Sequence, residues 1–195
     1  MKKIALFGGS FDPIHIGHAM VASYVAQYCA VDEVWLMPGR INPLKQGHRP
    51  APDEMRLEMC RKVASRIPGA KVCDLEMHLP APSYTIDTLK ELHRVYPDCR
   101  FSLLIGSDNW EVFHLWREHE QILASHGVII YPRPGHDVDA GTLPAGVILL
   151  GGEIPQTVMS STFVRNAIAE GRDMNFFLPE EVMKYIEINN LYSNA

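Results

Sequence analysis

The chain has 195 residues, a usual size for one domain, so we expect a single domain over residues 1–195. Apolar residues make up 47% of it and charged residues 21%, as in ordinary globular proteins, which excludes a largely disordered chain. The formal net charge of -5 argues against a protein that binds DNA or RNA through a broad basic surface.

No apolar run approaches the roughly 20 residues that cross a bilayer. The apolar start at residues 4–7 is too short for a signal peptide before glycines follow, so we expect a cytoplasmic protein with no membrane partner. The four cysteines, Cys29, Cys60, Cys73 and Cys99, are scattered and form no CxxC pair. This spacing favours reduced thiols and indicates no protein metal site.

Short apolar runs alternate with segments of helical periodicity along the whole chain. Strands are expected at residues 4–7, 34–37, 71–73, 101–105, 128–131 and 147–150. Helices are expected at residues 18–28, 53–66 with Asp53 as cap, 85–96, 110–124 in one or two pieces, 160–171 with Ser160 or Ser161 as cap, and 179–189. The alternation predicts a doubly wound α/β fold, with a mainly parallel sheet, helices on both faces and ligands beyond the carboxyl ends of the strands.

A glycine-rich segment, Gly8-Gly9-Ser10-Phe11-Asp12-Pro13-Ile14-His15-Ile16-Gly17-His18, joins the first strand to the first helix. Glycines let backbone N–H groups approach an anion, and the start of a helix adds donors and partial positive charge. His15 and His18 are three residues apart and would share one helix face. The segment lacks GxGxxG and the Gly-Lys-Ser/Thr ending of a Walker A loop, and the plainer alternative is a turn with two surface histidines.

A second segment with the same kind of chemistry is Ser160-Ser161-Thr162-Phe163-Val164-Arg165. Hydroxyls and N–H groups at a helix start can hold phosphates, and Arg165 would add a positive charge. The alternative is an ordinary serine cap followed by a solvated arginine. The presence of the first segment favours phosphate binding.

Together the two segments resemble the signatures of the HxGH nucleotidyltransferases, a superfamily with a Rossmann-like fold. Within it the chain is most similar to the bacterial nicotinate-nucleotide adenylyltransferases, and the resemblance covers nearly the whole chain. It includes Pro82-Ser83-Tyr84-Thr85, Ile105-Gly106-Ser107-Asp108, Trp116 and Leu191-Tyr192.

The resemblance implies transfer of AMP from ATP, which would bring Mg²⁺, to nicotinate mononucleotide. The residues that it implies for catalysis are His15, His18, Lys45 and Arg165. Those that it implies for ATP are Gly8, Gly9, Ser10, Phe11, Gly17, Gly106, Asp108, Ser160, Ser161 and Thr162. Those that it implies for the pyridine nucleotide are Ser83, Tyr84, Thr85, Trp116 and Arg117.

Some of these roles have plainer alternatives. Trp116 would stack on the pyridine ring, or it packs in the core. Asp108 would bind ribose hydroxyls, or it caps the next helix. The chain has Asn42-Pro43-Leu44-Lys45 where relatives often have PPHK, so only Lys45 matches there. Arg117 stands where relatives often have an aromatic residue, and we hypothesise that its charge favours an acidic ring substituent.

Two other functions remain open at this point. Another member of the superfamily, such as a pantetheine-phosphate adenylyltransferase or a cytidylyltransferase, shares the phosphate segments, although the former usually has Thr at the place of His15. A module that senses ATP or NAD without turnover would also need a phosphate site. The sequence does not decide the oligomeric state or rank nicotinate against nicotinamide mononucleotide.

Overall fold

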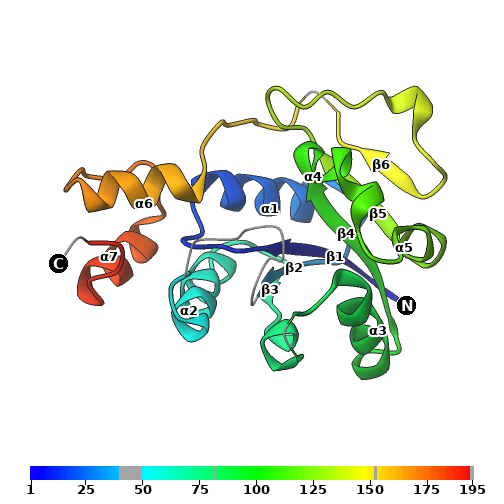
Figure 1. Ribbon diagram of the computed structural model, residues 1–195, viewed down its shortest axis with the longest axis horizontal. Helices are drawn as coiled ribbons and strands as arrows, with labels where there is room; N and C mark the ends of the chain where they lie inside the picture. Colours follow the sequence, from blue (N-terminus) through cyan, green and yellow to red (C-terminus); the bar gives the residue numbers. More distant parts are fainter. Residues whose placement is uncertain (40–49, 81, 152, 194–195) are drawn as a thin grey trace.

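The computed structural model describes residues 1–39, 50–80, 82–151 and 153–193. Its centre is one sheet of six strands in the order β3-β2-β1-β4-β5-β6, with every neighbouring pair parallel (Figure 1). The strands are β1 (Lys2–Gly9), β2 (Glu33–Pro38), β3 (Ala70–Val72), β4 (Cys99–Gly106), β5 (Gly127–Tyr131) and β6 (Val147–Leu149). This is the strand order of Rossmann-like folds, and it confirms the predicted doubly wound sheet.

Helices connect the strands and cover both faces of the sheet. They are α1 (Ile16–Tyr28), α2 (Asp53–Ala64), η1 (Leu75–His78), α3 (Thr85–Val95), α4 (Ser107–Glu111), η2 (Phe113–Leu115), α5 (His119–Ser125), η3 (Ala140–Thr142), α6 (Ser161–Ala169) and α7 (Glu180–Ile188). One core cluster joins α1, α2, α6 and α7 to the sheet, and the other joins α3, η2 and α5 to the opposite face.

Strand β1 shows why the core has two halves. Successive side chains of a strand point to opposite faces. Ala5 and Phe7 therefore pack in the cluster with α1 and α2, whereas Ile4 and Leu6 pack in the cluster with α3 and α5. All four side chains are buried, as expected for a central strand of a parallel sheet.

The helices follow the sequence signals with two corrections. The helix expected at residues 110–124 in one or two pieces is divided into three, α4, η2 and α5. The last two are separated because Trp116 is extended and Glu118 adopts a left-handed conformation with φ 52°. Asp53 was expected to cap α2, but Pro52 occupies the cap position. Asp53 is the first helical residue, and its carboxylate accepts a hydrogen bond from Arg56.

The strand order indicates where a ligand site is expected. The chain runs outward from β1 in one direction through β2 and β3, and in the other direction through β4, β5 and β6. Ligands of such sheets bind outside the carboxyl ends of the strands where the order reverses. Here these ends are Gly9 of β1 and Gly106 of β4. Within the described residues no helix is both long and apolar enough to span a bilayer.

Candidate active site

A cavity of about 400 Å³ lies at the carboxyl ends of β1 and β4. Most of the residues predicted for ligand binding line it. These are Gly8, Gly9, Ser10, Phe11, His18, Ser83, Tyr84, Thr85, Gly106, Asp108, Trp116, Arg117 and Ser161. The two phosphate segments and the predicted pyridine-nucleotide segment are therefore brought to one cavity, although they are far apart in the sequence.

The loop after β1 is shaped by close packing of its aromatic residue. Phe11 is buried with φ 44°, and its ring lies edge-on to Phe7 and His18, with centroid distances of 5.5 and 5.0 Å. A Cβ atom on Gly9 would lie 2.9 Å from this ring. Gly9 is therefore required by a close approach, and Phe11 lies against the histidine that faces the cavity.

His15 and His18 share a helix start but differ in exposure to the cavity. His15 caps α1, and its backbone N–H donates to Nδ1 of His18 at 3.3 Å. Because Nδ1 of His18 accepts this bond, the proton of the neutral ring lies on Nε2. His18 lines the cavity, whereas His15 is buried behind it.

The environment of His15 disfavours its charged form. Burial, and then the nearby charge of Arg133, lower the pKa of His15 to about 4. Its Nδ1 is buried and has no hydrogen-bond partner in the described part of the chain. A Cβ atom on Gly17 would lie 2.7 Å from Cγ2 of Thr157 and 3.1 Å from the His15 ring. Gly17 thus allows the chain that leads into the second segment to approach the first segment closely.

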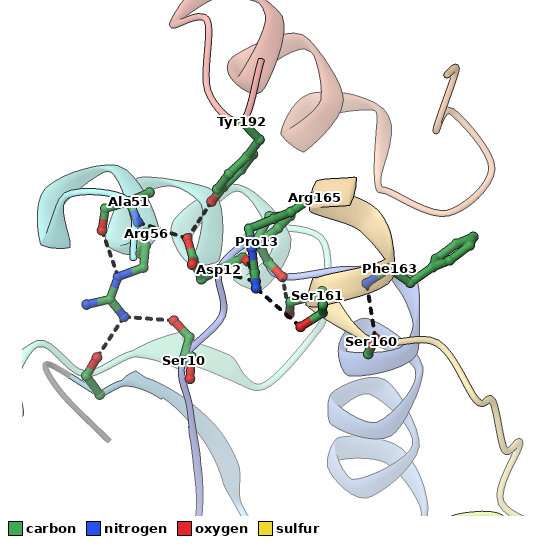
Figure 2. Close-up of polar contacts among 12 residues, drawn as sticks. Ser10, Asp12, Pro13, Ala51, Arg56, Ser160, Ser161, Phe163, Arg165 and Tyr192 are labelled. Atoms are coloured by element: carbon green, nitrogen blue, oxygen red, sulfur yellow. Dashed lines mark hydrogen bonds and ion pairs between the residues drawn. The ribbon is translucent and has the colours of Figure 1, made fainter. Parts of the chain in front are cut away.

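The second phosphate segment begins α6. Ser160 is the cap of this helix, and its hydroxyl accepts the N–H of Phe163 at 3.2 Å (Figure 2). Thr162 accepts a bond from Nη2 of Arg165 at 3.2 Å. Both residues lie beside Ser161, which lines the cavity. Their binding of phosphate stays a prediction.

Ser161 and Arg165 join this helix to the first loop (Figure 2). The Ser161 hydroxyl donates to the carbonyl of Pro13 at 2.9 Å, and Nη1 of Arg165 donates to the carbonyl of Asp12 at 2.7 Å. The Arg165 side chain is 18% exposed and points toward the loop backbone. The two motifs recognised separately in the sequence are one hydrogen-bonded unit.

At the end of β4 a close turn places an ion pair in the cavity. Asp108 accepts a bond from Nη1 of Arg133 at 3.2 Å, and Ser107 accepts the Arg133 backbone N–H at 2.9 Å. A Cβ atom on Gly106 would lie only 2.3 Å from Oδ1 of Asp108. Asp108 does not cap α4, whose cap is Gly106. Its carboxylate instead orients Arg133 at the cavity wall.

The opposite wall is formed by the start of α3. Tyr84 is the cap of this helix and Thr85 its first residue. The hydroxyl of Ser83 donates to Oε1 of Glu76 at 2.9 Å, so the carboxylate from η1 holds the segment that enters the helix. All of these side chains line the cavity.

Two further predicted residues, Trp116 and Arg117, close this side. The Trp116 ring is partly buried against Phe113, with ring centroids 5.2 Å apart, and it also lines the cavity. The guanidinium of Arg117 lies 5.0 Å from the centre of the Tyr84 ring and donates to Asp87 at 3.4 Å. Trp116 therefore both packs in the core and lines the cavity.

Five residues were given no role on sequence grounds. Glu76 and Arg133 line the cavity, whereas Asp12, Arg56 and Tyr192 support the loop after β1 from behind it. Arg56 is fully buried, and its Nη1 donates to the carbonyls of Ser10 and Gly39, both at 2.7 Å (Figure 2). The signal that could have indicated Arg133 is its position directly after a buried strand, two residues beyond Tyr131. Asp12 and Tyr192 lie in segments that the sequence had already singled out, but nothing local indicates that they contact each other, and nothing local indicates Arg56 or Glu76.

Lys45, with the loop that carries it, lies outside the described residues, so its role stays a prediction. Across the described ranges, no group of three or more His, Cys, Asp and Glu side chains could hold a metal ion. Among the described residues that line the cavity, the side chains with basic groups are those of His18, Arg117 and Arg133. The carboxylates of Glu76 and Asp108 also line the cavity, and Asp108 pairs with Arg133, so the basic side chains offer an anionic ligand hydrogen-bond donors rather than a large excess of positive charge.

Known proteins match the chain over nearly its whole length. The cytidylyltransferase-like family model matches residues 6–167. A protein of Bacteroides fragilis named "Probable nicotinate-nucleotide adenylyltransferase" is 45% identical over 184 residues, which are 94% of this chain and 90% of that protein. A protein of the same name from Flavobacterium johnsoniae is 37% identical over 190 residues, covering 97% and 98% of the two chains.

A solved structure shares the fold. The nicotinic acid mononucleotide adenylyltransferase of Plasmodium falciparum, solved in complex with NaAD, superimposes with a TM-score of 0.82 at 25% identity and covers 98% of each chain. The relatives, the family model and the arrangement of the two phosphate segments agree with one another. The chain belongs to the nicotinate-nucleotide adenylyltransferases of the cytidylyltransferase-like family.

Proposed function

We propose that this protein transfers the AMP group of ATP to nicotinate mononucleotide, giving nicotinate adenine dinucleotide and pyrophosphate in NAD biosynthesis. The observation that carries the proposal is the composition of the cavity. Its one side is made by the loop after β1, His18 and Ser161, which suit a triphosphate. The other side is made by Thr85 and Trp116, where a flat ring and its carboxylate fit.

In the proposed reaction a phosphate oxygen of the mononucleotide attacks the α-phosphorus of ATP. A new P–O bond forms as the bond between the α-phosphorus and the bridging oxygen to the β-phosphate breaks, and pyrophosphate leaves with the bonding electrons. A phosphate monoester is largely ionised at neutral pH, because its second pKa is about 6. The reaction therefore needs no side chain as a base, and catalysis rests on positioning and charge stabilisation.

The position of each side chain indicates which phosphate group it would bind. Nε2–H of His18 would donate to the α-phosphate as its charge develops, and the backbone around Gly9 and Ser10 would hold the adjoining oxygens. Ser160, Ser161, Thr162 and Arg165 would bind the β- and γ-phosphates that leave, with Lys45 serving the same chain of phosphates. His15, which is buried behind the cavity, would act on the phosphates through its contacts with His18. Arg133 would add charge from the β5 side of the cavity.

The metal that accompanies the nucleotide would be Mg²⁺, which enters as part of the substrate MgATP. Mg²⁺ prefers phosphate and water oxygens to an all-protein cage. Asp108 would bind ribose hydroxyls once the nucleotide is seated. We propose the cytoplasm as the location, where ATP and pyridine nucleotides are available together.

Pyrophosphate release from MgATP tests the reaction and its substrate together. Nicotinate mononucleotide, nicotinamide mononucleotide and phosphopantetheine are supplied separately at matched concentrations. Fast turnover with the nicotinate nucleotide is expected. Turnover with phosphopantetheine alone would be consistent with the proposed phosphate site but would contradict the proposed substrate. ATP binding without turnover of any of the three compounds would favour a sensor.

A further inference from the structure

The loop that connects β1 to α1 is held at three places by elements that are distant in the sequence (Figure 2). From α2, the guanidinium of Arg56 binds the carbonyl of Ser10. From α6, Arg165 binds the carbonyl of Asp12. From the segment after α7, the hydroxyl of Tyr192 donates to Oδ1 of Asp12 at 2.7 Å, across 180 positions of the chain.

Asp12 is where these contacts converge. Its side chain is nearly fully buried, with 1% of the residue exposed. Oδ1 accepts the Tyr192 hydroxyl and the backbone N–H of Ala51, the latter at 3.0 Å, while Oδ2 lies 3.7 Å from Nη1 of Arg165. A buried carboxylate requires hydrogen-bond donors, and the loss of one of these donors destabilises the folded protein.

The backbone of Tyr192 is constrained so that its side chain points inward. Its φ angle is 63°, in the left-handed region that bulky residues rarely adopt. The ring packs against the core cluster of α1, α2, α6 and α7, and Figure 2 shows the hydroxyl directed at Asp12. Burial raises the pKa of Tyr192, so the hydroxyl keeps its proton and remains a donor.

We propose that Tyr192 is a positioning residue for ATP, which acts through Asp12 on the phosphate-binding loop and on Arg165. The proposal rests on the adenylyltransferase function proposed above. Neither Tyr192 nor Asp12 is among the described residues that line the cavity, so any effect on ATP must be transmitted.

The effect of Tyr192 reaches the phosphate-binding loop through Arg165, for which two oxygen atoms of Asp12 compete. Nη1 of this residue now lies 2.7 Å from the carbonyl of Asp12 and 3.7 Å from Oδ2 of the same residue. When the Tyr192 hydroxyl is removed, the under-satisfied carboxylate draws the guanidinium toward itself. Arg165 then leaves the loop carbonyl and Thr162, and both phosphate segments lose their relative position.

The test compares Tyr192→Phe with Tyr185→Phe as a matched control. Tyr185 lies in α7 and packs on the same core, and the described residues provide no hydrogen-bond partner for its hydroxyl. Each substitution removes one oxygen atom from a partly buried tyrosine. Unfolding curves of both variants set an assay temperature at which each is fully folded.

For Tyr192→Phe we expect kcat/KM for ATP to fall about 10- to 100-fold, as for a misplacement of about 1 Å transmitted from outside the site. The KM for nicotinate mononucleotide should stay within about twofold, because Thr85 and Trp116 are not attached to this network. Tyr185→Phe should keep both parameters within about twofold of the original protein. A rise in the KM for nicotinate mononucleotide equal to the rise in the KM for ATP, or no difference between the two variants, would refute the proposal.

A double-substitution cycle tests the route through Asp12. If Tyr192 acts through this carboxylate, Tyr192→Phe should add little to the loss caused by Asp12→Asn. Additive losses would show that the hydroxyl acts elsewhere. If the unmodified protein shows no turnover, the proposed function fails by itself, and the affinity of both tyrosine variants for a non-hydrolysable ATP analogue still decides whether Tyr192 positions the phosphate loop.

Discussion

The imidazole rings of His15 and His18 are stacked, with centroids 3.7 Å apart and an angle of 25° between their planes. His15 also donates its backbone N–H to Nδ1 of His18. One ring is buried and the other lines the cavity. Two histidines that look equivalent in the sequence therefore have different surroundings, and substitutions of them should have different consequences.

Replacement of His18 by Ala should lower kcat by about 10²- to 10³-fold, the usual effect of removing one donor placed for the transition state. The measurement is pyrophosphate release at saturating MgATP and nicotinate mononucleotide. His78→Ala is a suitable control, because this histidine is 75% exposed on η1. Near-normal turnover of His18→Ala would show that another group stabilises the α-phosphate.

His15 should make folding stability depend on pH. Its pKa is about 4 in the folded protein and about 6.5 when unfolded, so the unfolded chain binds more protons between these values. The stabilisation by the neutral ring is therefore complete above about pH 6.5 and is lost as the pH falls toward 4. The difference between the two pKa values corresponds to a change of about 3 kcal/mol at most in the free energy of unfolding.

Urea unfolding of the original protein and of His15→Asn across this pH range measures the sign and the size of the contribution of His15 to the free energy of unfolding. Asn retains a good helix cap but does not titrate. The pKa of His126 is also lowered by burial, but this residue is present in both proteins and cancels in the difference. Parallel curves of unfolding free energy against pH would contradict the assigned environment of His15.

Replacement of Arg56 by Met should lower the free energy of unfolding by about 3–5 kcal/mol, because the buried guanidinium satisfies several groups at once. Its Nη1 binds the carbonyls of Ser10 and Gly39, and its Nε binds the carbonyl of Ala51 at 3.1 Å. Its Nη2 pairs with Asp53 at 2.6 Å. Chemical denaturation measures the loss.

Arg61→Met on the same helix provides the comparison. Arg61 is 43% exposed and pairs with Glu54, so its removal should change stability by less than about 1 kcal/mol. Equal effects of the two substitutions would mean that the buried contacts of Arg56 contribute no more than a surface ion pair.

Arg117 should contribute modestly to the preference for nicotinate over nicotinamide mononucleotide. Its side chain is 53% exposed, and Asp87 and Glu118 already offset its charge. Exposed charge pairs contribute up to about 1 kcal/mol, so Arg117→Ala should lower the ratio of the two kcat/KM values by at most about fivefold. Asp87→Asn should raise the same ratio, because it removes a competing carboxylate. An unchanged ratio in Arg117→Ala would exclude the role.

Much of the fold was predictable because its signals are local. The apolar runs at residues 101–105 and 128–131 stop at the ends of β4 and β5, and the two glycines that end β1 mark the turn toward α1. The exception is the region after β4, where the left-handed Glu118 separates η2 from α5. The sequence allowed two pieces here but did not indicate where they separate, and in the structure Trp116 packs against Phe113 beside that break.

The sequence by itself determined the alternation of strands and helices and the presence of the two glycine- and hydroxyl-rich segments that we predict to bind phosphate, because periodicity and motif spacing involve residues that are close along the chain. Only the tertiary structure decided that His15 is buried while His18 lines the cavity, that Arg133 lines the cavity from the segment after β5, and that Tyr192 binds Asp12. These relations depend on burial and on contacts between distant segments, and they arise only when the sheet and its helices are assembled.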